Sequence, residues 1–249
     1  MNELVVNADD LGLSREINKG IFQGLGRGVV SDASLLVDAP SAEEALGGLE
    51  KAGMSSLGIH VNLDPLFGWD LPGVERYSRP ELMSKLEEGA FLARCAGAAR
   101  AQIEKFLSWG LTPSHLDTHH HVHGFLPIFS LLVDLAREYG IPALRFSPAG
   151  YSLTSRKPVP HDEQTSARMK GILDREGIFC CEEMVEGVEK LFRIGSFPAE
   201  LVAHPSLGGD AWRAREMETL LSEEFLREIT EKGIRIASFS ELAGRAQGT

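Results

Sequence analysis

Histidines are concentrated in one short stretch of the chain. Five of the eight histidines and one aspartate lie within the ten residues from Ser114 to His123, which read SHLDTHHHVH. Histidine is the commonest imidazole ligand for metals and the side chain whose ordinary pKa lies closest to neutrality. A purification tag or a solvated polar turn fits poorly, because a Thr-Pro pair precedes the stretch and an apolar helical segment follows it. The stretch is therefore a candidate metal or acid–base site.

Strand alternation indicates which of these side chains lie together. If residues 114–118 form a β-strand, His115, Asp117 and His119 project from one face, with His119 where the strand ends. The chain then turns into a helix predicted over Pro127–Tyr139. We expect the other histidines of the stretch to be supporting or surface groups.

Other predicted strands also carry or lead into residues that could do chemistry. Each is a short apolar run of the length expected for a buried strand. The polar residues in question are Asp9 and Asp10 after strand 4–8, His60 in strand 57–63, Arg145 in strand 143–146 and His204 in strand 200–205. Taken singly, such a histidine is more often a satisfied core group, and such an aspartate a loop or capping residue.

Helical periodicity separates most of these strands. Ser14 is a favourable N-cap for the first helix, and Ser41 with Glu44 forms a capping box for the second. Further helices are predicted over 80–109 with a break near Gly89 or Gly97, and over 127–139, 167–175 and 182–192; the remaining strands are 29–37 and 234–238. Long loops are predicted at Asp64–Pro80, which contains Phe67, Trp69 and Tyr77, and at Ser147–Ser166.

This alternation predicts an α/β fold with a parallel sheet, which is either an open sheet or a barrel. The barrel is favoured because the polar residues come from five strands, each near its carboxyl end, where parallel barrels build their active sites. No glycine-rich phosphate loop follows the first strand, as a nucleotide-binding open sheet would require. We expect a single (β/α) barrel-like domain over residues 1–249, distorted or with fewer than eight strands.

Composition narrows the range of partners. A formal net charge of -11 argues against nucleic acid and anionic membranes, since no basic patch is available to neutralise phosphates. The three cysteines lack CxxC spacing, which favours reduced thiols and a cytoplasmic protein. Neither a secretion signal nor an apolar run near 18 residues is evident. The oligomeric state is left open, with a homodimer among the options.

One carboxylate and two imidazoles from three strands would make a metal site with open positions for water and substrate. Such donors suit Zn²⁺ or another first-row divalent ion. A second carboxylate beside the site could then deprotonate a water molecule whose pKa the ion lowers. The successive residues Asp9 and Asp10 provide this division of roles, because both can reach the barrel mouth at a turn.

Four motifs resemble those of the YdjC-like carbohydrate deacetylases, a group that includes chitooligosaccharide deacetylase. They are NADDLG at 7–12, GIHVNL at 58–63, HLDTHHHVH at 115–123 and AHP at 203–205. The resemblance covers essentially the whole chain, and the first three motifs in this order are specific. The family's more usual phenylalanine after the aspartate pair is Leu11 here, which leaves the metal site unaffected. The two long loops carry no matching motif.

The resemblance implies a barrel-like fold and metal-dependent removal of N-acetyl groups from acetylated amino sugars or chitooligosaccharides. It implies that Asp10, His60 and His119 hold one divalent ion, Mg²⁺ or Zn²⁺, and that Asp9 is the general base. We assign His204 as the group that protonates the leaving amine. The supporting or substrate-contacting residues would be Asp117, His115, Arg145 and Trp69.

Two other classes remain as alternatives. One is another metal-dependent barrel enzyme, either a phosphoesterase, which would need a second cluster of bridging carboxylates, or a sugar isomerase, which would need a lysine or glutamate near the site. Neither feature is visible at the strand ends in the sequence. The other is a metal- or sugar-binding protein without turnover, against which the intact Asp9 argues.

Overall fold

The computed structural model describes residues 2–54, 56–69, 77–146, 149–152, 157–160 and 163–248 of the 249-residue chain. Its strands are β1 (Asn2–Leu11), β2 (Asp32–Leu35), β3 (Leu57–Val61), β4 (Leu116–Thr118), β5 (Ala149–Ser152), β6 (Lys157–Pro160), β7 (Glu183–Glu186), β8 (Ala199–Ala203) and β9 (Ile234–Ile236). Its α-helices are α1 (Arg15–Gly26), α2 (Ala42–Ala52), α3 (Asp64–Phe67), α4 (Arg79–Glu87), α5 (Gly89–Ser108), α6 (Leu126–Tyr139), α7 (Glu163–Glu176), α8 (Ala211–Leu220), α9 (Glu223–Glu231) and α10 (Phe239–Gln247). Two 3₁₀ helices, η1 (His119–Gly124) and η2 (Val188–Arg193), complete the described elements.

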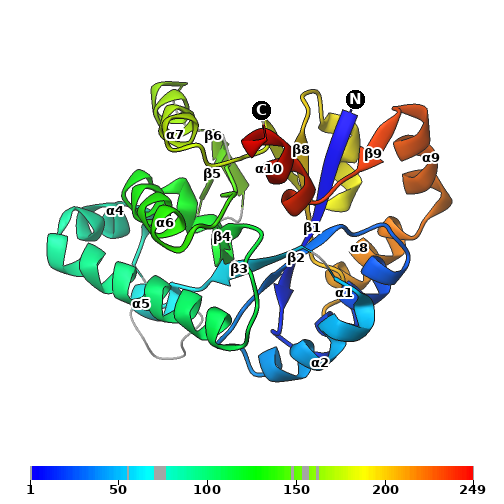
Figure 1. Ribbon diagram of the computed structural model, residues 1–249, viewed down its shortest axis with the longest axis horizontal. Helices are drawn as coiled ribbons and strands as arrows, with labels where there is room; N and C mark the ends of the chain where they lie inside the picture. The colour runs from blue at the N-terminus through cyan, green and yellow to red at the C-terminus, as the bar shows by residue number, and fades with distance from the viewer. Residues whose placement is uncertain are drawn as a thin grey trace.

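Seven strands form one parallel sheet, which curves into an incomplete barrel between flanking helices. The strand order is β4-β3-β2-β1-β8-β7, and β9 pairs with the start of β1. Helices α4 to α7 lie to one side of the central strands, and α1, α8 and α9 lie to the other (Figure 1). The predicted (β/α) barrel-like fold with fewer than eight strands is confirmed.

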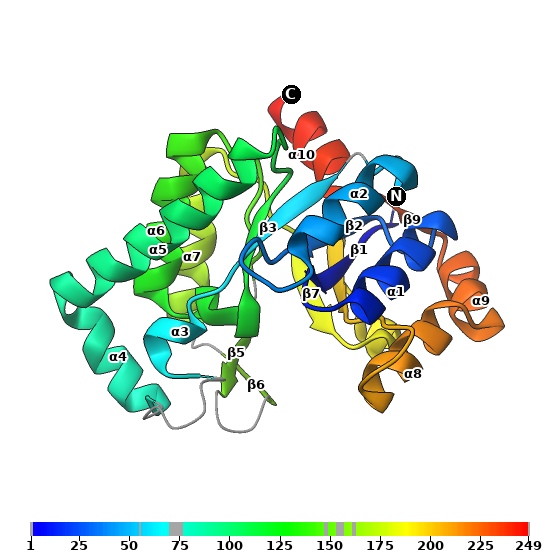
Figure 2. The same ribbon diagram turned by 90° about the horizontal axis from the view of Figure 1, so that it is seen from below.

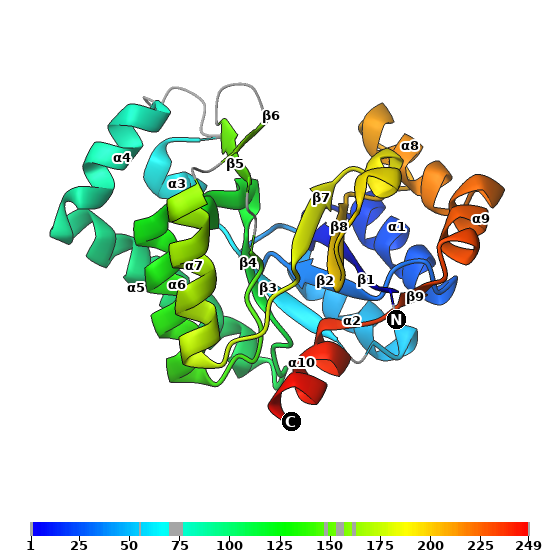
Figure 3. The same cartoon turned by 90° about the horizontal axis from the view of Figure 1, so that it is seen from above.

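Helix α10 and the antiparallel hairpin β5–β6 lie at opposite ends of the molecule (Figures 2 and 3). Helices α3 and α8, which follow β3 and β8 in the chain, lie toward the hairpin end. The carboxyl ends of the parallel strands therefore face the hairpin, and their amino ends face α10. The candidate residues predicted near strand exits are consequently brought to the hairpin end.

Several predicted boundaries are confirmed by the local structure. The side chain of Ser14 accepts a hydrogen bond from the backbone N–H of Ile17 and caps α1. The break predicted in the long helical segment falls between α4 and α5, where α5 begins at Gly89. Gly97 lies inside α5, so the alternative break at that residue is wrong.

Two predicted elements are wrong. The segment 182–192 is not an α-helix but strand β7 followed by η2, because β7 pairs with β8 and tertiary pairing overrides the local helical pattern. The segment 143–146 is not a regular strand: it contributes only isolated parallel bridges, Leu116 with Leu144 and Ala143 with Phe179. Strand β4 is the last regular strand at this edge of the sheet. The two bridges continue the parallel pairing past β4.

The two predicted loops contain regular structure. The stretch 64–80 includes α3 and the start of α4, and its residues 70–76 lie outside the described ranges. The stretch 147–166 includes the hairpin β5–β6 and the first turn of α7, with 147–148, 153–156 and 161–162 outside the described ranges. The sequence showed no periodicity for these pieces because each is only four residues long or starts at a loop boundary.

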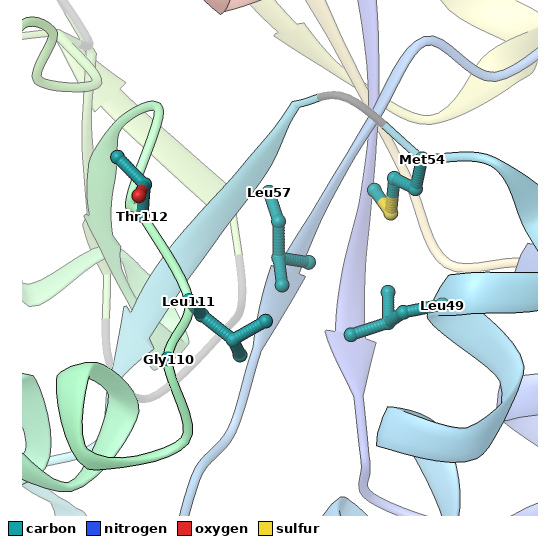
Figure 4. Close-up of a pocket in the computed structure, with 6 residues that line it drawn as sticks. All are labelled: Leu49, Met54, Leu57, Gly110, Leu111 and Thr112. Atoms are coloured by element: carbon teal, nitrogen blue, oxygen red, sulfur yellow. The ribbon is translucent and has the colours of Figure 1, made fainter.

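A continuous apolar core fills the space between the sheet and the helices. The three cysteines are buried and form no disulfide. A pocket of about 240 Å³ lies at the start of β3 and is lined by Leu49, Met54, Leu57, Gly110, Leu111 and Thr112 (Figure 4). Its lining is mixed polar and apolar, and it lies at the strand end away from His60. The helices in the described ranges include no segment long and apolar enough to span a bilayer.

Candidate metal centre and active site

The end of β1 brings two successive aspartates to one place. In a regular strand their side chains would point to opposite faces. The pairing of β1 with β2 is irregular between Ala8 and Leu11, and Asp10 adopts a left-handed φ of 68°. As a result, Oδ2 of Asp9 and Oδ1 of Asp10 lie 3.8 Å and 3.4 Å from Nε2 of His60. Both carboxylates therefore face the same imidazole.

Asp10, His60 and His119 form a compact donor set at the ends of β1, β3 and β4. Oδ1 of Asp10 lies 3.0 Å from Nδ1 of His119, and one ligand atom from each of the three residues lies within 4.8 Å of the others. Ligands bound to one ion at about 2.0–2.2 Å are separated by roughly 3–4 Å. The three residues thus fit a single divalent cation, and the donor types suit Zn²⁺ or a similar ion.

Asp117 orients the His60 ring. Oδ1 of Asp117 lies 2.7 Å from Nδ1 of His60, which leaves Nε2 directed at Asp9 and Asp10. A carboxylate behind an imidazole ligand fixes the tautomer and raises ligand basicity. Burial lowers the pKa of His60, but Asp117, Asp9 and Asp10 outweigh burial and hold this pKa well above its ordinary value. The His60 site therefore favours a positive charge, whether a proton or a cation.

His115 is linked to Asp117 through the hydroxyl of Ser34. Its Nε2 lies 3.1 Å from Oγ of Ser34, and the same hydroxyl donates to Asp117 at 2.7 Å. A Cβ on Gly58 would meet the His115 ring at 2.3–2.6 Å, so glycine is required there. Burial lowers the pKa of His115 to about 4 and keeps the ring neutral. His115 and Asp117 thus lie together as predicted.

Arg145 is a fully buried cation shared by three carboxylates. Its Nη1 and Nη2 donate to both oxygens of Asp9 at 2.8 Å and 2.7 Å. Its guanidinium also lies 2.9 Å from Oδ2 of Asp117 and donates through Nε to Glu200 at 2.8 Å. Burial raises the pKa of Asp9, but the Arg145 charge outweighs it and keeps the carboxylate ionised. Burial raises the pKa of Glu200 to about 7.

His204 follows β8 and is held between two glutamates. Its Nδ1 lies 3.7 Å from Oε2 of Glu216 in α8, and its Nε2 lies 3.8 Å from Oε1 of Glu186 in β7. Burial lowers the pKa of His204, but the nearby Glu216 carboxylate and the charges of Asp10 and Asp9 raise it to about 8. These neighbours therefore favour the protonated form of His204.

Helix α8 contributes a cation to the aspartate pair. Nη2 of Arg213 donates to Oδ2 of Asp10 at 2.5 Å, and the guanidinium lies over the Trp212 ring at 4.6 Å. The Trp212 ring in turn meets the His204 ring edge to face at 5.4 Å. Because Arg213 occupies Oδ2 of Asp10, Oδ1 is the oxygen of this carboxylate that is available to a cation.

The remaining histidines of the stretch have separate partners. His121 and His123 are buried, so of the two alternatives expected for them, supporting or surface groups, the surface position does not apply. Nδ1 of His123 lies 2.8 Å from Oγ1 of Thr118, whose hydroxyl also accepts from the backbone of His123. Nε2 of His121 lies 3.5 Å from Glu186. The chain turns tightly through η1, with left-handed φ values at His120 and His121. The rings nevertheless stay close in pairs: the centroids of His119 and His120 lie 4.1 Å apart, and those of His121 and His123 lie 5.6 Å apart.

Trp69 lies beside this cluster and is mostly buried. Its ring packs edge to face on Phe67 at 5.0 Å and lies 6.1 Å from His120. The indole Nε1 donates to the backbone carbonyl of Tyr77. These contacts explain the position of the Trp69 ring by packing within the protein. A contact between Trp69 and substrate remains a prediction.

Sequence reasoning gave no role to several residues of this cluster, namely Asp64, Glu186, Glu200, Arg213 and Glu216. Glu200 opens a strand that was predicted, so its burial could have been inferred from alternation. Arg213 and Glu216 stand three residues apart on a helix, a spacing typical of solvated ion pairs, and nothing in the sequence marks them as site residues.

An incomplete parallel (β/α) barrel with carboxylates and imidazoles gathered at its strand ends is typical of metal-dependent barrel proteins. Comparison with known proteins is more specific. A family model described as YdjC-like protein matches residues 3–231, and the chain belongs to this family.

Similar proteins carry related names. The chain is 30% identical to a carbohydrate deacetylase of Brevibacillus brevis, with 96% of this chain and 99% of that protein covered. It is 27% identical to a carbohydrate deacetylase of Clostridium beijerinckii, with 96% and 99% covered. It is 28% identical to a chitooligosaccharide deacetylase of Klebsiella pneumoniae, with 96% and 98% covered.

Among solved structures, a protein of Enterococcus faecalis V583 named for cellobiose-phosphate cleavage has a similar fold. The TM-score is 0.73 at 24% identity, with 97% of this chain and 98% of that chain covered. This likeness supports the barrel-like architecture.

Proposed function

We propose that this protein is a metal-dependent hydrolase that removes N-acetyl groups from acetylated amino sugars or chitooligosaccharides. The observation that carries the proposal is the position of Asp9. It lies beside the Asp10–His60–His119 donor set, yet its own oxygens are held by Arg145. This difference supports a role for Asp10 as a ligand and for its neighbour Asp9 as a base. The names of the relatives supply the substrate class.

Asp10, His60 and His119 would hold the cation. When bound, a divalent ion polarises an acyl carbonyl and lowers the pKa of water toward neutrality. The mutual distances of the three donors and the carboxylate behind His60 match a site that is organised before binding.

Asp9 would accept the proton from the attacking water. Arg145 keeps this carboxylate ionised and fixes its plane, and the amide of Asn7 donates to Oδ1 at 2.7 Å. Oδ2 is the oxygen that faces His60, so it would be the one that takes the proton. A base held in this way is already oriented before the reaction, so its orientation adds little to the free energy of activation.

His204 would donate a proton to the departing amine. It follows β8, the strand that pairs with β1, and Glu216 and Glu186 flank its two ring nitrogens. A pKa raised to about 8 keeps the ring protonated at neutral pH, as a general acid requires. The base and the acid are thus different residues with their pKa values moved in opposite directions from neutrality.

Acetate release from N-acetylglucosamine oligomers tests the proposal. The protein should release acetate, lose this activity after chelation and regain it when a divalent cation is restored. A phosphodiester and an unacetylated aldose should remain unchanged in the same preparation. Turnover of either of these in place of acetate release would support the phosphoesterase or isomerase alternative, and metal binding without any turnover would support a binding protein.

A further inference from the structure

His119 faces a second set of donors on the far side of its ring. While Nδ1 contacts Asp10, Nε2 lies 3.8 Å from Oδ2 of Asp64. The same Asp64 oxygen is 2.7 Å from Nδ1 of His120. One ligand atom each from Asp64, His119 and His120 lies within 4.8 Å of the other two. These three residues are called the outer donor set here, and Asp10, His60 and His119 the inner donor set.

We propose that the outer donor set binds a second divalent cation, so that His119 links two metal ions. A carboxylate and two imidazoles suit Zn²⁺ or another first-row ion at the outer site as well. When both sites fill, each ring nitrogen of His119 serves one ion, and the remaining ring N–H proton passes to solvent. The cation would lie beside Oδ2 of Asp64 and Nδ1 of His120, which are 2.7 Å apart without it. The inference concerns metal binding and does not depend on the proposed reaction.

The contrast with Asp117 separates a ligand from an orienting carboxylate. Asp117 lies 2.7 Å from His60, at hydrogen-bonding distance, and therefore positions that ring directly. Asp64 lies 3.8 Å from Nε2 of His119, too far for a hydrogen bond. That separation falls within the roughly 3–4 Å expected for two ligands of one ion. Asp64 is thus poorly placed to orient His119 and well placed to share a cation with it, whereas its 2.7 Å distance from Nδ1 of His120 would have to lengthen when both atoms bind the ion.

The second oxygen of Asp64 points to the same conclusion. The residue is 2% exposed, and its Oδ1 is buried and accepts no hydrogen bond from any residue that the structure describes. A buried carboxylate oxygen without a donor is unfavourable because desolvation is not compensated. A cation at the outer donor set would supply the missing charge.

The segment that carries Asp64 is fixed in place by neighbouring side chains. Gln102 of α5 donates to the backbone carbonyl of Asn62 at 2.9 Å and accepts from its N–H at 2.8 Å. The Asn62 side chain then accepts from the backbone N–H of Asp64 at 2.9 Å. On the histidine side, His120 is held in a left-handed conformation with φ 53°. His120 remains 27% exposed, so an ion can reach the outer donor set from solvent.

Metal stoichiometry tests the inference. Chelator-stripped protein is titrated with Zn²⁺ or Co²⁺, passed through a desalting column, and its bound metal measured by elemental analysis. The parent should bind two equivalents. Asp64→Asn and His120→Gln should each bind one, His60→Ala should keep one at the outer site, and the double variant His60→Ala/Asp64→Asn should bind none. Asp32→Asn, which changes a buried carboxylate away from both donor sets, should still bind two.

The outcomes separate the second site from an orienting role. One equivalent in the parent, or two in both Asp64→Asn and His120→Gln, would overturn the proposal. A parent with one equivalent whose affinity falls in Asp64→Asn would show that Asp64 only supports His119. Retained inner-site binding, together with an unchanged circular dichroism spectrum, shows that the variants have folded. Because acetate release is measured separately, failure of the outer site leaves the proposed reaction standing.

Discussion

Buried carboxylates lie at both ends of the parallel sheet, with different neighbours. At the carboxyl end, Asp9 and Asp10 meet imidazoles from two other strands. At the amino end, Asp32 begins β2 and accepts hydrogen bonds from the hydroxyl of Ser56 and from the backbone N–H of Phe239 in α10. Both environments are fully buried. Burial of a carboxylate therefore does not identify a site by itself.

The partners of each carboxylate make the difference. The hydroxyl and amide at Asp32 join β2 to α10 and to the chain before β3, which is a structural role. The ring nitrogens at the other end are donors that a cation can use, and they converge from separate strands. Convergence of ligand atoms, more than charge or burial, distinguishes the hairpin end from the α10 end. Five substitutions test this comparison.

Loss of a ring from the inner donor set should have the largest effect. His60→Ala and His119→Ala each leave the inner site with two protein ligands, so its affinity for Zn²⁺ should fall by more than the roughly 100-fold seen when an orienting residue is removed. Titration with a competing chelator measures this affinity. Folding should survive, as thermal melting would show. Unchanged inner-site affinity in both variants would remove the assignment.

Asp9→Asn should spare the metal and abolish most turnover. The substitution removes a base without removing a ligand of the inner donor set, so acetate release should fall by about 10²–10⁴ at unchanged metal content. Full activity would rule out Asp9 as the base. Loss of metal instead would mean that Asp9 and Asp10 exchange their assigned roles.

Asp117→Asn should have an intermediate effect. It keeps the shape of the side chain behind His60 but removes its charge, so the inner-site affinity should fall by about 10–100-fold. The number of metal equivalents bound at saturation should stay the same, unlike in His60→Ala. A variant with parental affinity would show that Asp117 serves only to balance Arg145, to which it is also paired.

The inner donor set was largely predictable from the sequence because each member lies at a strand end. Parallel strands bring their carboxyl ends to one edge, so His60, His119 and the aspartate pair had to be close. The barrel class followed from the same alternation of strands and helices. What local pattern did not reveal was the departure from regularity: the irregular pairing and left-handed Asp10 that let both aspartates face His60.

Residues recruited from outside the strand ends were harder to foresee. Arg213 and Glu216 reach the site because α8 packs beside the carboxyl end of β8, a tertiary contact that helix periodicity does not encode. The segment 182–192 was wrongly predicted as a helix for a related reason. Its conformation is decided by pairing with β8, which the local sequence pattern does not reveal. The strand-end donors were therefore easier to predict from the sequence than the residues that support them.

Asp32→Asn should leave metal binding and acetate release unchanged and alter only how stability depends on pH. Burial raises the pKa of Asp32 to about 7, against an ordinary value of 3.8. The folded state thus binds more protons than the unfolded state between these values, and stability is lost as pH rises from about 4 through 7. For one proton the slope reaches at most about 1.4 kcal/mol per pH unit.

Urea unfolding of metal-free parent and variant at several values of pH between 4.5 and 8 measures this contribution. The slope, not the absolute stability, is the readout, because the amide must also replace the hydrogen bonds of the carboxylate. The difference in unfolding free energy between variant and parent should shift in favour of the variant as pH rises. Parallel pH profiles would show that Asp32 titrates normally, and a change in metal affinity would mean that the two ends of the sheet are coupled. The first result would contradict the raised pKa of Asp32. The second would break the distinction between this structural carboxylate and those of the donor sets.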